Sequence, residues 1–468
     1  MSKQKKLYIL FILLAAVVMN VYILTYQPGY GGESIDMVVD MESNLSENIQ
    51  IFYNNVSGSY EFKEEDSQTI SLEGNKRKNL TYSISSDSNT LRMDFGMEKS
   101  TIRIHSITMK YGRNKVQIPV DNFLSLLKFN DLESVELEGD SVVIQTKPGD
   151  PYAVLNLSDY DFISMIKQSK DFSMTVKKVI YCILVNAFMI GFLVKTNQVT
   201  AGLKEIVHNR KLIQSLAVND FKTQFAGSYL GIIWALVQPI VTVLVYWFVF
   251  QVGLRNGNIT SPDGKIVPFV LWLMAGLVPW FYYQDALNGG TSCLLAYNYL
   301  VKKVVFNIDI LPIVKVLSSI FVHGFFVLFM LCVYAAYGFF PDVYTIQIIY
   351  YSFCILVLVL GLVYLTSAVV VFFRDLTQII NIILQVQTWL TPIMWNIDAI
   401  KLNPLIKSLI KLNPMFYIVN GYRDALINKV FFWERIDLTI YFWCFTAICF
   451  IFGTNTFRKL KIHFADVL

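Results

Sequence analysis

Hydrophobic and polar residues follow two different patterns along this chain. Eight apolar stretches approach the roughly 20 residues that a helix needs to cross a bilayer core about 30 Å thick. Between the first two stretches, apolar and polar residues alternate in short runs, which is typical of strands with one buried face. We therefore predict a polytopic α-helical membrane protein with an inserted β-rich domain. The predicted spans are about 7–26, 176–195, 230–252, 268–286, 312–339, 346–373, 376–395 and 436–456.

The first apolar stretch is predicted to form an N-terminal transmembrane anchor over residues 1–26. Lys3, Lys5 and Lys6 precede it, and no small-residue cleavage site of a secretory signal follows it. Because basic residues favour the cytoplasmic side of a membrane, we expect the N-terminus in the cytoplasm and the following residues outside.

Residues 27–172 are predicted to form an extracellular antiparallel β-sandwich. The segments 49–53 and 101–109 alternate in the manner of strands, and Gly and Asn separate such runs. The block is acidic, with 23 Asp and Glu against 14 Lys and Arg, whereas the whole chain has a formal net charge of +4. It has no Trp and a single histidine, His105. It therefore shows no convincing catalytic group and only weak grounds for carbohydrate binding.

Flanking charges set the remaining boundaries. A second transmembrane helix is predicted over 173–196, followed by an amphipathic cytoplasmic helix on the membrane surface over 197–228. A core of six membrane helices is predicted over 229–457, and a basic cytoplasmic tail over 458–468. Both termini are thus expected in the cytoplasm.

One segment of the membrane core, residues 396–435, does not fit a simple external loop. It carries several Lys and Arg residues on the side where the topology expects few. We predict short re-entrant helices here, separated by Pro392, Pro404 and Pro414, because backbone at membrane depth is tolerated where protein buries it.

The composition restricts the partners of the chain. With 54% hydrophobic residues and a mean hydropathy of +0.48, it is not an ordinary soluble protein. The basic excess outside the β-rich block fits the anionic cytoplasmic leaflet, so we expect membrane lipids and no nucleic acid as partners. The six cysteines lie in or beside apolar stretches, which favours packing over disulfides or a metal site.

The second half of the chain contains four stretches with a recognisable order: Asn219–Pro239, Asn298–Pro312, Phe372–Gln378 with Thr391–Trp395, and Leu412–Asp424. Together they resemble the permease subunit of ABC transporters that export polysaccharides, the O-antigen, teichoic-acid and capsule export family. The resemblance covers residues 203–468, and the first 200 residues are an addition to it. The family usually has a basic residue in place of Gln224, and Phe-Pro in place of Phe306-Asn307.

The resemblance implies a function in transport. It implies export of a lipid-linked polysaccharide across a bacterial plasma membrane by a homodimer of permeases. The chain has no phosphate-binding loop of the form G-x-x-x-x-G-K-[ST], and its Gly264-Lys265 pair stands in a predicted external loop. We therefore expect it not to be an enzyme and to hold no cofactor. The family implies two copies of a separate ABC subunit that binds ATP and Mg²⁺.

The family also implies where the ATP-driven motor makes contact. The surface helix 203–226 and the short crossing 296–308, which precedes Pro312 as a helix start, resemble the segments that dock on the motor. An ordinary cytoplasmic loop is the alternative for the crossing. The candidate coupling residues are Asp220, Lys222, Tyr299, Lys302, Lys303 and Asn307.

A polar stripe marks the predicted span 376–395. Its members are spaced by three or four residues and so share one helix face. Amides are costly against lipid, so this face must contact either another helix or a watery cavity, and both alternatives stay open. In a sugar channel, nearby aromatic residues would stack on sugar rings. The stripe is Gln378, Asn381, Gln385, Thr388 and Pro392, and the other candidate channel residues are Trp389, Tyr246 and Phe250.

Three charged residues are candidates for gating or for contact with the pyrophosphate of a lipid carrier: Arg374, Asp375 and Arg423. Asp375 with Gln378 also fits a helix-capping arrangement, which we favour over gating. Arg423 could instead pair with its neighbour Asp424. His323, in the middle of a span, is expected to be a hydrogen-bonded core residue and not a proton relay.

Two other functions stay open at this stage. One is a type-2 ABC exporter of a drug or small lipid, for which a narrow apolar channel would be expected. The other is a membrane glycosyltransferase or polymerase acting on lipid-linked sugars. An enzyme of that kind needs acidic residues together near a membrane face, whereas Asp309, Asp375 and Asp398 are scattered along the sequence.

Overall fold

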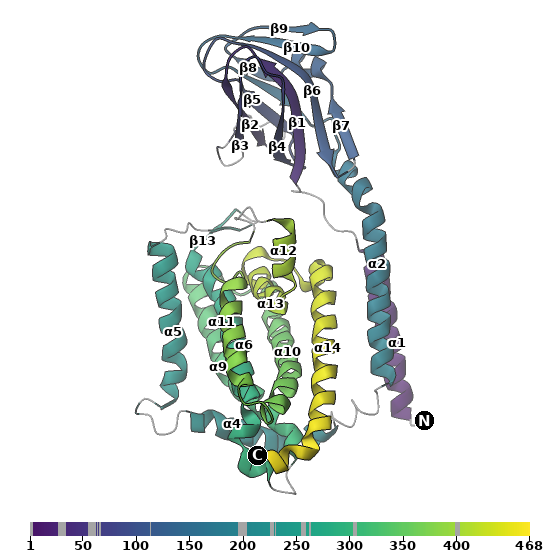
Figure 1. Ribbon diagram of the computed structural model, residues 1–468, viewed down its shortest axis with the longest axis vertical. Helices are drawn as coiled ribbons and strands as arrows, with labels where there is room; N and C mark the ends of the chain where they lie inside the picture. Colours follow the sequence, from purple (N-terminus) through teal and green to yellow (C-terminus); the bar gives the residue numbers. More distant parts are fainter. Residues whose placement is uncertain are drawn as a thin grey trace. The chain divides into compact units, whose positions relative to one another are not determined.

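The computed structural model shows two compact units, Leu24–Cys182 and Met1–Ile23 with Ile183–Leu468 (Figure 1). Each unit has a hydrophobic core of its own. The residues described are 3–26, 34–54, 62, 64, 67–112, 114–194, 204–224, 229, 231–253, 259–261, 264–302, 307–397 and 403–468.

The first unit contains two sheets in which the described strands pair antiparallel. One sheet has the order β4-β1-β6-β10-β9, with β7 also paired to β6, and the other has the order β3-β2-β5-β11-β8. The strands are β1 (Ser34–Ser43), β2 (Glu47–Asn54), β3 (Ser67–Leu72), β4 (Lys78–Ser85), β5 (Thr90–Asp94), β6 (Thr101–Tyr111), β7 (Asn114–Ile118), β8 (Lys128–Asn130), β9 (Leu132–Glu138), β10 (Ser141–Thr146) and β11 (Tyr152–Asn156).

Alternating side chains build the core between these sheets. In β1, Met37 and Val39 are fully buried while their neighbours are more exposed, as the period of two requires. They share one apolar cluster with Ile49 and Ile51 of the other sheet. The prediction of an antiparallel β-rich domain is confirmed, and its two sheets pack face to face as in a sandwich.

Helix α2 (Phe162–Val194) begins earlier than the sequence suggested. Its 33 residues include the polar segment 167–171, which the prediction assigned to the β-domain. The first two turns bury Phe162, Met165 and Ile166 in the core of the β-domain. The membrane-crossing part of this helix, Met174–Gly191, lies within the predicted span 173–196. The prediction missed only that the last residues of the β-domain are already helical, because an apolar-run criterion does not recognise a helix that starts with an amphipathic segment.

Helix α1 (Lys3–Thr25) is the other N-terminal helix. The side-chain amide of Asn20 donates to Asn186 Oδ1 of α2 over 2.9 Å. The Tyr22 hydroxyl donates to the carbonyl of Trp433 over 2.7 Å. In lipid such an amide pair holds two helices together, and the gain is modest because the separated helices also find polar partners. The N-terminal helices thus contact each other and the membrane core within one chain.

The second unit is a helical bundle. Residues 204–208 are also helical and precede α4. Its further helices are α4 (Arg210–Gln224), α5 (Trp234–Trp247), α6 (Phe269–Thr291), α7 (Cys293–Ala296), α8 (Asn298–Val301), α9 (Leu311–Ala336), α10 (Gln347–Val370), α11 (Leu376–Leu390), α12 (Pro404–Lys411), α13 (Pro414–Arg423), α14 (Ile436–Leu460) and α15 (Phe464–Val467), with a β12 (Ile259–Thr260) and β13 (Ile266–Val267) hairpin before α6. A π-helical turn, Phe248–Gly253, continues α5, and another, Asp424–Asn428, continues α13.

Four described helical segments are long and apolar enough to cross a membrane: Met174–Gly191, Ile308–Ala336, Tyr344–Val370 and Phe432–His463. Two shorter apolar helices lie at Ile12–Thr25 and Pro239–Gly253. The predicted polytopic helical architecture is thus confirmed, whereas the predicted count of eight spans is not. The span predicted at 376–395 is a 15-residue helix, α11, which ends at Leu390. Pro392 lies beyond that end and not on the polar face of the helix.

Short helices do occupy the segment 396–435. Two of them begin with the same Asn-Pro pair, in which the Asn side chain accepts a hydrogen bond from a first-turn amide. Asn403 caps α12 in this way and Asn413 caps α13. Proline at the first position suits its missing N–H. Asp398 and residues 399–402 lie outside the described part of the chain.

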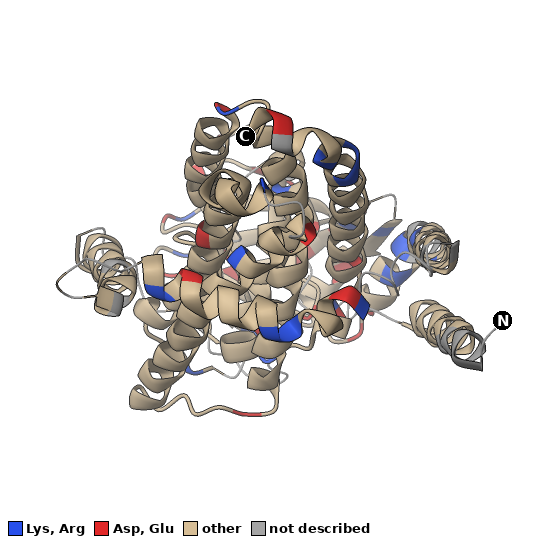
Figure 2. Ribbon diagram, turned by 90° about the horizontal axis from the view of Figure 1, so that it is seen from below, with Lys and Arg blue, Asp and Glu red and all other residues tan. Residues whose placement is uncertain are grey.

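Small residues allow a close contact between two helices of the bundle. Helices α10 and α14 meet at Gly361 and Gly453, where a Cβ added to Gly453 would lie 2.3 Å from the Gly361 carbonyl oxygen. Because lipid is as apolar as the side chains, the hydrophobic effect does not drive membrane helices together. Close backbone approach of this kind provides van der Waals packing instead. Seen from below, the long helices carry little charge along most of their ribbons (Figure 2).

Candidate functional site: a polar membrane cavity and its cytoplasmic contacts

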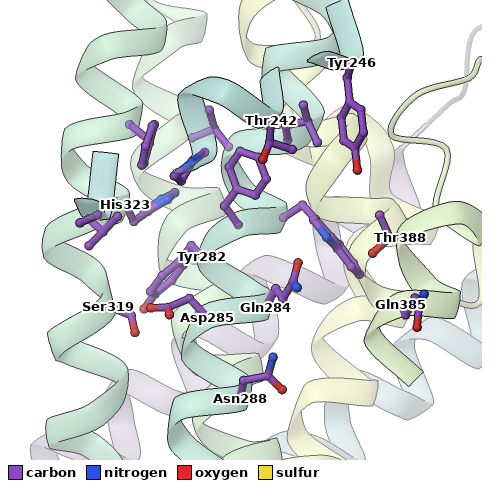
Figure 3. Close-up of a pocket in the computed structure, with 18 of the residues that line it drawn as sticks. Thr242, Tyr246, Tyr282, Gln284, Asp285, Asn288, Ser319, His323, Gln385 and Thr388 are labelled. Atoms are coloured by element: carbon purple, nitrogen blue, oxygen red, sulfur yellow. The ribbon is translucent and has the colours of Figure 1, made fainter. Parts of the chain in front are cut away.

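A cavity of 740 Å³ lies among α5, α6, α9 and α11 (Figure 3). Its lining mixes amides, hydroxyls and aromatic rings, although the helices that enclose it are mainly apolar. The polar lining residues are Gln224, Thr242, Gln284, Asp285, Asn288, Ser319, His323, Asn381, Gln385 and Thr388, and the aromatic ones are Trp234, Tyr246, Trp280, Phe281, Tyr282, Phe326 and Trp389.

The structure places most of the predicted channel residues on this cavity. Asn381, Gln385, Thr388 and Trp389 line it from α11, and Tyr246 lines it from α5. Gln378 is exposed and is not among the lining residues. Phe250 is also absent from the lining, because its ring packs on Phe269, with 6.2 Å between the ring centroids.

Helix α6 supplies polar groups that sequence reasoning missed. Gln284 and Asp285 are exposed towards the cavity, and Asn288 follows one turn later on the same face (Figure 3). The missed signal was a polar group at helical spacing near the end of an apolar span. Such residues, like those of α11, are costly against lipid and mark a cavity or a helix contact.

His323 forms part of the wall of the cavity. Its Nε2 lies 3.0 Å from Ser352 Oγ and 3.1 Å from the Tyr422 hydroxyl oxygen. Its ring stacks on Tyr282, with centroids 4.6 Å apart. The interpretation of His323 as a hydrogen-bonded core histidine is therefore confirmed.

At the cytoplasmic end of the bundle, Asp220 connects three elements. Its carboxylate on α4 lies 2.9 Å from Lys315 Nζ of α9 and accepts a hydrogen bond from the Tyr297 hydroxyl, between α7 and α8. Asp220 is only 6% exposed. Burial, together with the bonded carboxylate, raises the pKa of the Tyr297 hydroxyl, so it stays a donor to Asp220 at neutral pH.

Apolar contacts surround this link. Ile213 and Ala217 of α4 pack with Ile313 and Val314 of α9 in a small buried cluster. Asn307 donates a hydrogen bond to Glu205, which joins the end of the crossing to the helical segment before α4. The surface helix, the crossing and a membrane helix are therefore tied together by these contacts.

The other candidate coupling residues differ from Asp220 in position. Tyr299, Lys302 and Lys222 are exposed, so their side chains are free to meet another protein. Lys303 lies outside the described residues. Asp220 itself is too buried to touch a partner subunit, and its contacts are internal to the chain.

Arg374 and Asp375 are exposed at the start of α11. The predicted capping arrangement is wrong, because Asp375 has helical dihedral angles and its side chain makes no capping hydrogen bond. A helix N-cap needs a non-helical backbone for its side chain to reach the first free amides. Both residues do lie at a helix junction, as predicted, and their proposed role in gating or pyrophosphate contact rests on that position alone.

Arg423 does not have the exposed position that contact with a lipid pyrophosphate would require. It is 5% exposed, and its guanidinium donates to the carbonyls of Pro392 and Ile393 over 2.7 and 2.8 Å. Its Cζ lies 3.4 Å from the centroid of the Trp272 ring. Asp424 pairs with Arg435 and not with Arg423. Arg423 thus fastens the turn after α11 to α13 and α6.

Comparison with known proteins places this geometry in a class. Residues 211–427 match the family described as ABC-2 type transporter, and this segment contains the cavity and the Asp220 link. This part of the chain is therefore similar to the membrane domain of ABC-2 type transporters, and about 210 residues that hold the β-domain precede it.

The relatives narrow the class further. The chain is 27% identical to the O-antigen export system permease protein RfbA of Myxococcus xanthus over 221 residues, 47% of this chain and 82% of that protein. It is 25% identical to RfbA of Klebsiella pneumoniae over 265 residues, 55% of this chain and 95% of that protein. The polysialic acid transport protein KpsM of Escherichia coli is 22% identical over 250 residues, 53% and 92% of the two chains. Over these spans the chain is thus similar to the permeases of polysaccharide export systems.

Proposed function

We propose that this protein is the membrane subunit of an ABC transporter that exports a lipid-linked polysaccharide across a bacterial plasma membrane. The observation that carries the proposal is the cavity within the ABC-2 domain, whose walls combine amides with aromatic rings. Amides exchange hydrogen bonds with sugar hydroxyls, and aromatic rings cover the apolar faces of sugars. Many weak contacts of this sort let a chain slide, whereas one tight site would stall it.

The same cavity weighs against the two alternatives. A drug or small-lipid exporter would favour an apolar lining, but ten polar residues line this cavity. For a glycosyltransferase, the candidate acids are not brought together among the described residues. Asp309 pairs with Lys461 over 2.8 Å, and Asp375 is exposed at the start of α11.

Energy is proposed to enter through the cytoplasmic contacts. Two copies of a separate subunit would bind ATP with Mg²⁺ and dock on the exposed face that includes Tyr299, Lys302 and Lys222. Movement of that face would pass through Tyr297 and Asp220 to Lys315 on α9, which also contributes Ser319 to the cavity wall. Two copies of this chain would enclose the complete passage. In this arrangement both termini are cytoplasmic and the β-domain is extracellular.

Purification from the native cell in mild detergent tests the proposal. We expect an ATP-binding subunit to co-purify, the isolate to hydrolyse ATP, and lipid-linked glycan to be bound. Deleting the gene should remove a surface polysaccharide. A chain that purifies alone without ATPase activity would contradict the proposal and favour the enzyme alternative. An ATPase-active complex that carries a small amphiphile and leaves surface glycan unchanged would favour the drug or lipid exporter.

A further inference from the structure

The cavity lining has an unbalanced charge. Asp285 contributes a carboxylate, and no Lys or Arg is found among the residues that line the cavity in the described part of the chain. In Figure 3, Asp285 lies between Ser319 of α9 and Gln284 of its own helix. The remaining polar groups of the lining are neutral amides, hydroxyls and the His323 ring.

Two cations that lie beside α6, Lys315 and Arg423, already have other partners. Lys315 passes beside α6, where a Cβ added to Gly289 would meet its Cε at 2.9 Å. Its Nζ, however, is already paired with Asp220. Arg423 is held by the carbonyls of Pro392 and Ile393 and by the Trp272 ring. His323 Nε2 faces the uncharged hydroxyls of Ser352 and Tyr422.

An uncompensated carboxylate in such a place acts strongly on a passing chain. Low-dielectric walls reduce screening, so charge–charge interactions inside a membrane cavity exceed those in water. A glycan with a carboxylate or phosphate on each repeat would be repelled every time a repeat passed Asp285. A glycan of neutral sugars would instead find amide and hydroxyl partners for its own hydroxyls.

We propose that this cavity takes glycans whose repeats carry no net negative charge and disfavours polyanionic ones, with Asp285 as the discriminating residue. The inference deepens the proposed function and rests on it for the identity of the cargo as a glycan. It also implies that the anionic head of a lipid carrier is not held next to Asp285.

The test measures the charge preference of the cavity directly. Asn288 lines the cavity one helical turn from Asp285 and is replaced by cysteine, N288C, in the purified complex. The four native cysteines that are not buried, Cys182, Cys332, Cys444 and Cys449, are replaced by serine. Cationic and anionic methanethiosulfonate reagents are then compared. The exposed residue Ser408 on α12, changed to cysteine, is the matched control outside the cavity.

We expect the cation-to-anion ratio of modification rates at N288C to exceed that of a free thiol by about tenfold. The added change Asp285→Asn should bring the ratio close to the free-thiol value, with no effect at S408C. A ratio that Asp285→Asn leaves unaltered, or a preference for the anionic reagent, would overturn the proposal.

A second measurement asks about the glycan itself. Maltoheptaose, a neutral sugar, should slow modification of N288C, and an oligogalacturonate of equal length should not do so until Asp285 is changed to Asn. Equal protection by both sugars with Asp285 present would overturn the proposed selectivity, and protection by neither would overturn the assignment of glycan to this cavity. The export function is tested separately, by co-purification of the ATP-binding subunit and by the loss of surface glycan on gene deletion.

Discussion

The β-domain and the membrane unit place polar and apolar residues in opposite ways. In the β-domain, Met37 and Val39 are buried and charged residues pair on the surface, as Arg77 does with Asp40 over 2.6 Å. In the membrane unit, Ile382 and Val386 of α11 are exposed, while Asp220, His323 and Arg423 are buried.

This difference shows where function can be found from structure. Polar residues on the surface of the β-domain are solvated by water at no cost, so their presence on that surface indicates little about a functional site. In the membrane unit a buried polar group is costly, so its contacts, or its place on the cavity wall, indicate what it does. Asp220 links three elements, Arg423 secures a turn, and the amides of α6 and α11 line the cavity.

The largest effect is expected from removing the buried cation, with Arg423→Ala. The carbonyls of Pro392 and Ile393 would lose their donors and Trp272 its stacked guanidinium, at a cost on the order of 3 kcal/mol. The thermal midpoint of the purified protein in detergent should fall strongly. Lys411→Ala, at an exposed lysine of α12, is the control and should change little. Equal midpoints for the two variants would contradict a structural role for Arg423.

A smaller loss is expected where α10 and α14 meet. Gly453→Ala puts a methyl group against the Gly361 carbonyl and should cost about 1–3 kcal/mol through overpacking. Gly324→Ala on α9 is the matched control, since no atom lies within 4 Å of its added Cβ, and should cost less than about 0.5 kcal/mol. Thermal midpoints in detergent compare the two. If both variants were equally stable, the close contact would not be as tight as the structure shows.

The smallest effect concerns Glu47, a buried carboxylate of the β-domain. Its burial is costly, as it is for polar groups in the membrane unit. Burial raises its pKa, and its Oε1 has no hydrogen-bond partner among the described residues. Above its folded pKa the ionised form therefore lowers stability, and Glu47→Gln should stabilise the domain at pH 7. The gain should vanish below about pH 4, where glutamate is protonated in both states.

Hydrogen exchange of β-strand amides in the full chain measures this gain. Glu136→Gln changes an exposed carboxylate of β9 and serves as the control. A destabilised β-domain in Glu47→Gln at pH 7 would show that the ionised form of Glu47 makes a favourable contact, contrary to the prediction.

Much of this organisation could be predicted from the sequence. Period-two alternation gave the β-domain, Pro312 at the first turn of α9 marked a helix start, and the spacing of Asn381, Gln385 and Thr388 gave a shared face. These features depend on local geometry, which sequence spacing encodes.

Features that depend on packing between distant segments were not predictable. Nothing local distinguishes the buried Asp220 from the exposed Lys222, because their difference arises from Lys315 and Tyr297. Arg423 looked like a surface charge for the same reason. Asp285 was overlooked because only the approach of α5, α9 and α11 shows that its helix face borders a cavity.

Asp220→Asn tests most directly whether buried polar contacts of the membrane unit transmit ATP-driven movement to a glycan passage. Export of surface glycan and ATP hydrolysis are measured together, with Asp220→Lys combined with Lys315→Asp as the charge-swapped rescue. We predict that the motor subunit stays bound and active while glycan exported per ATP falls about tenfold, with partial recovery in the swapped pair. Unchanged export, or a parallel loss of export and ATPase activity through loss of the motor subunit, would show that the Asp220 link does not transmit this movement.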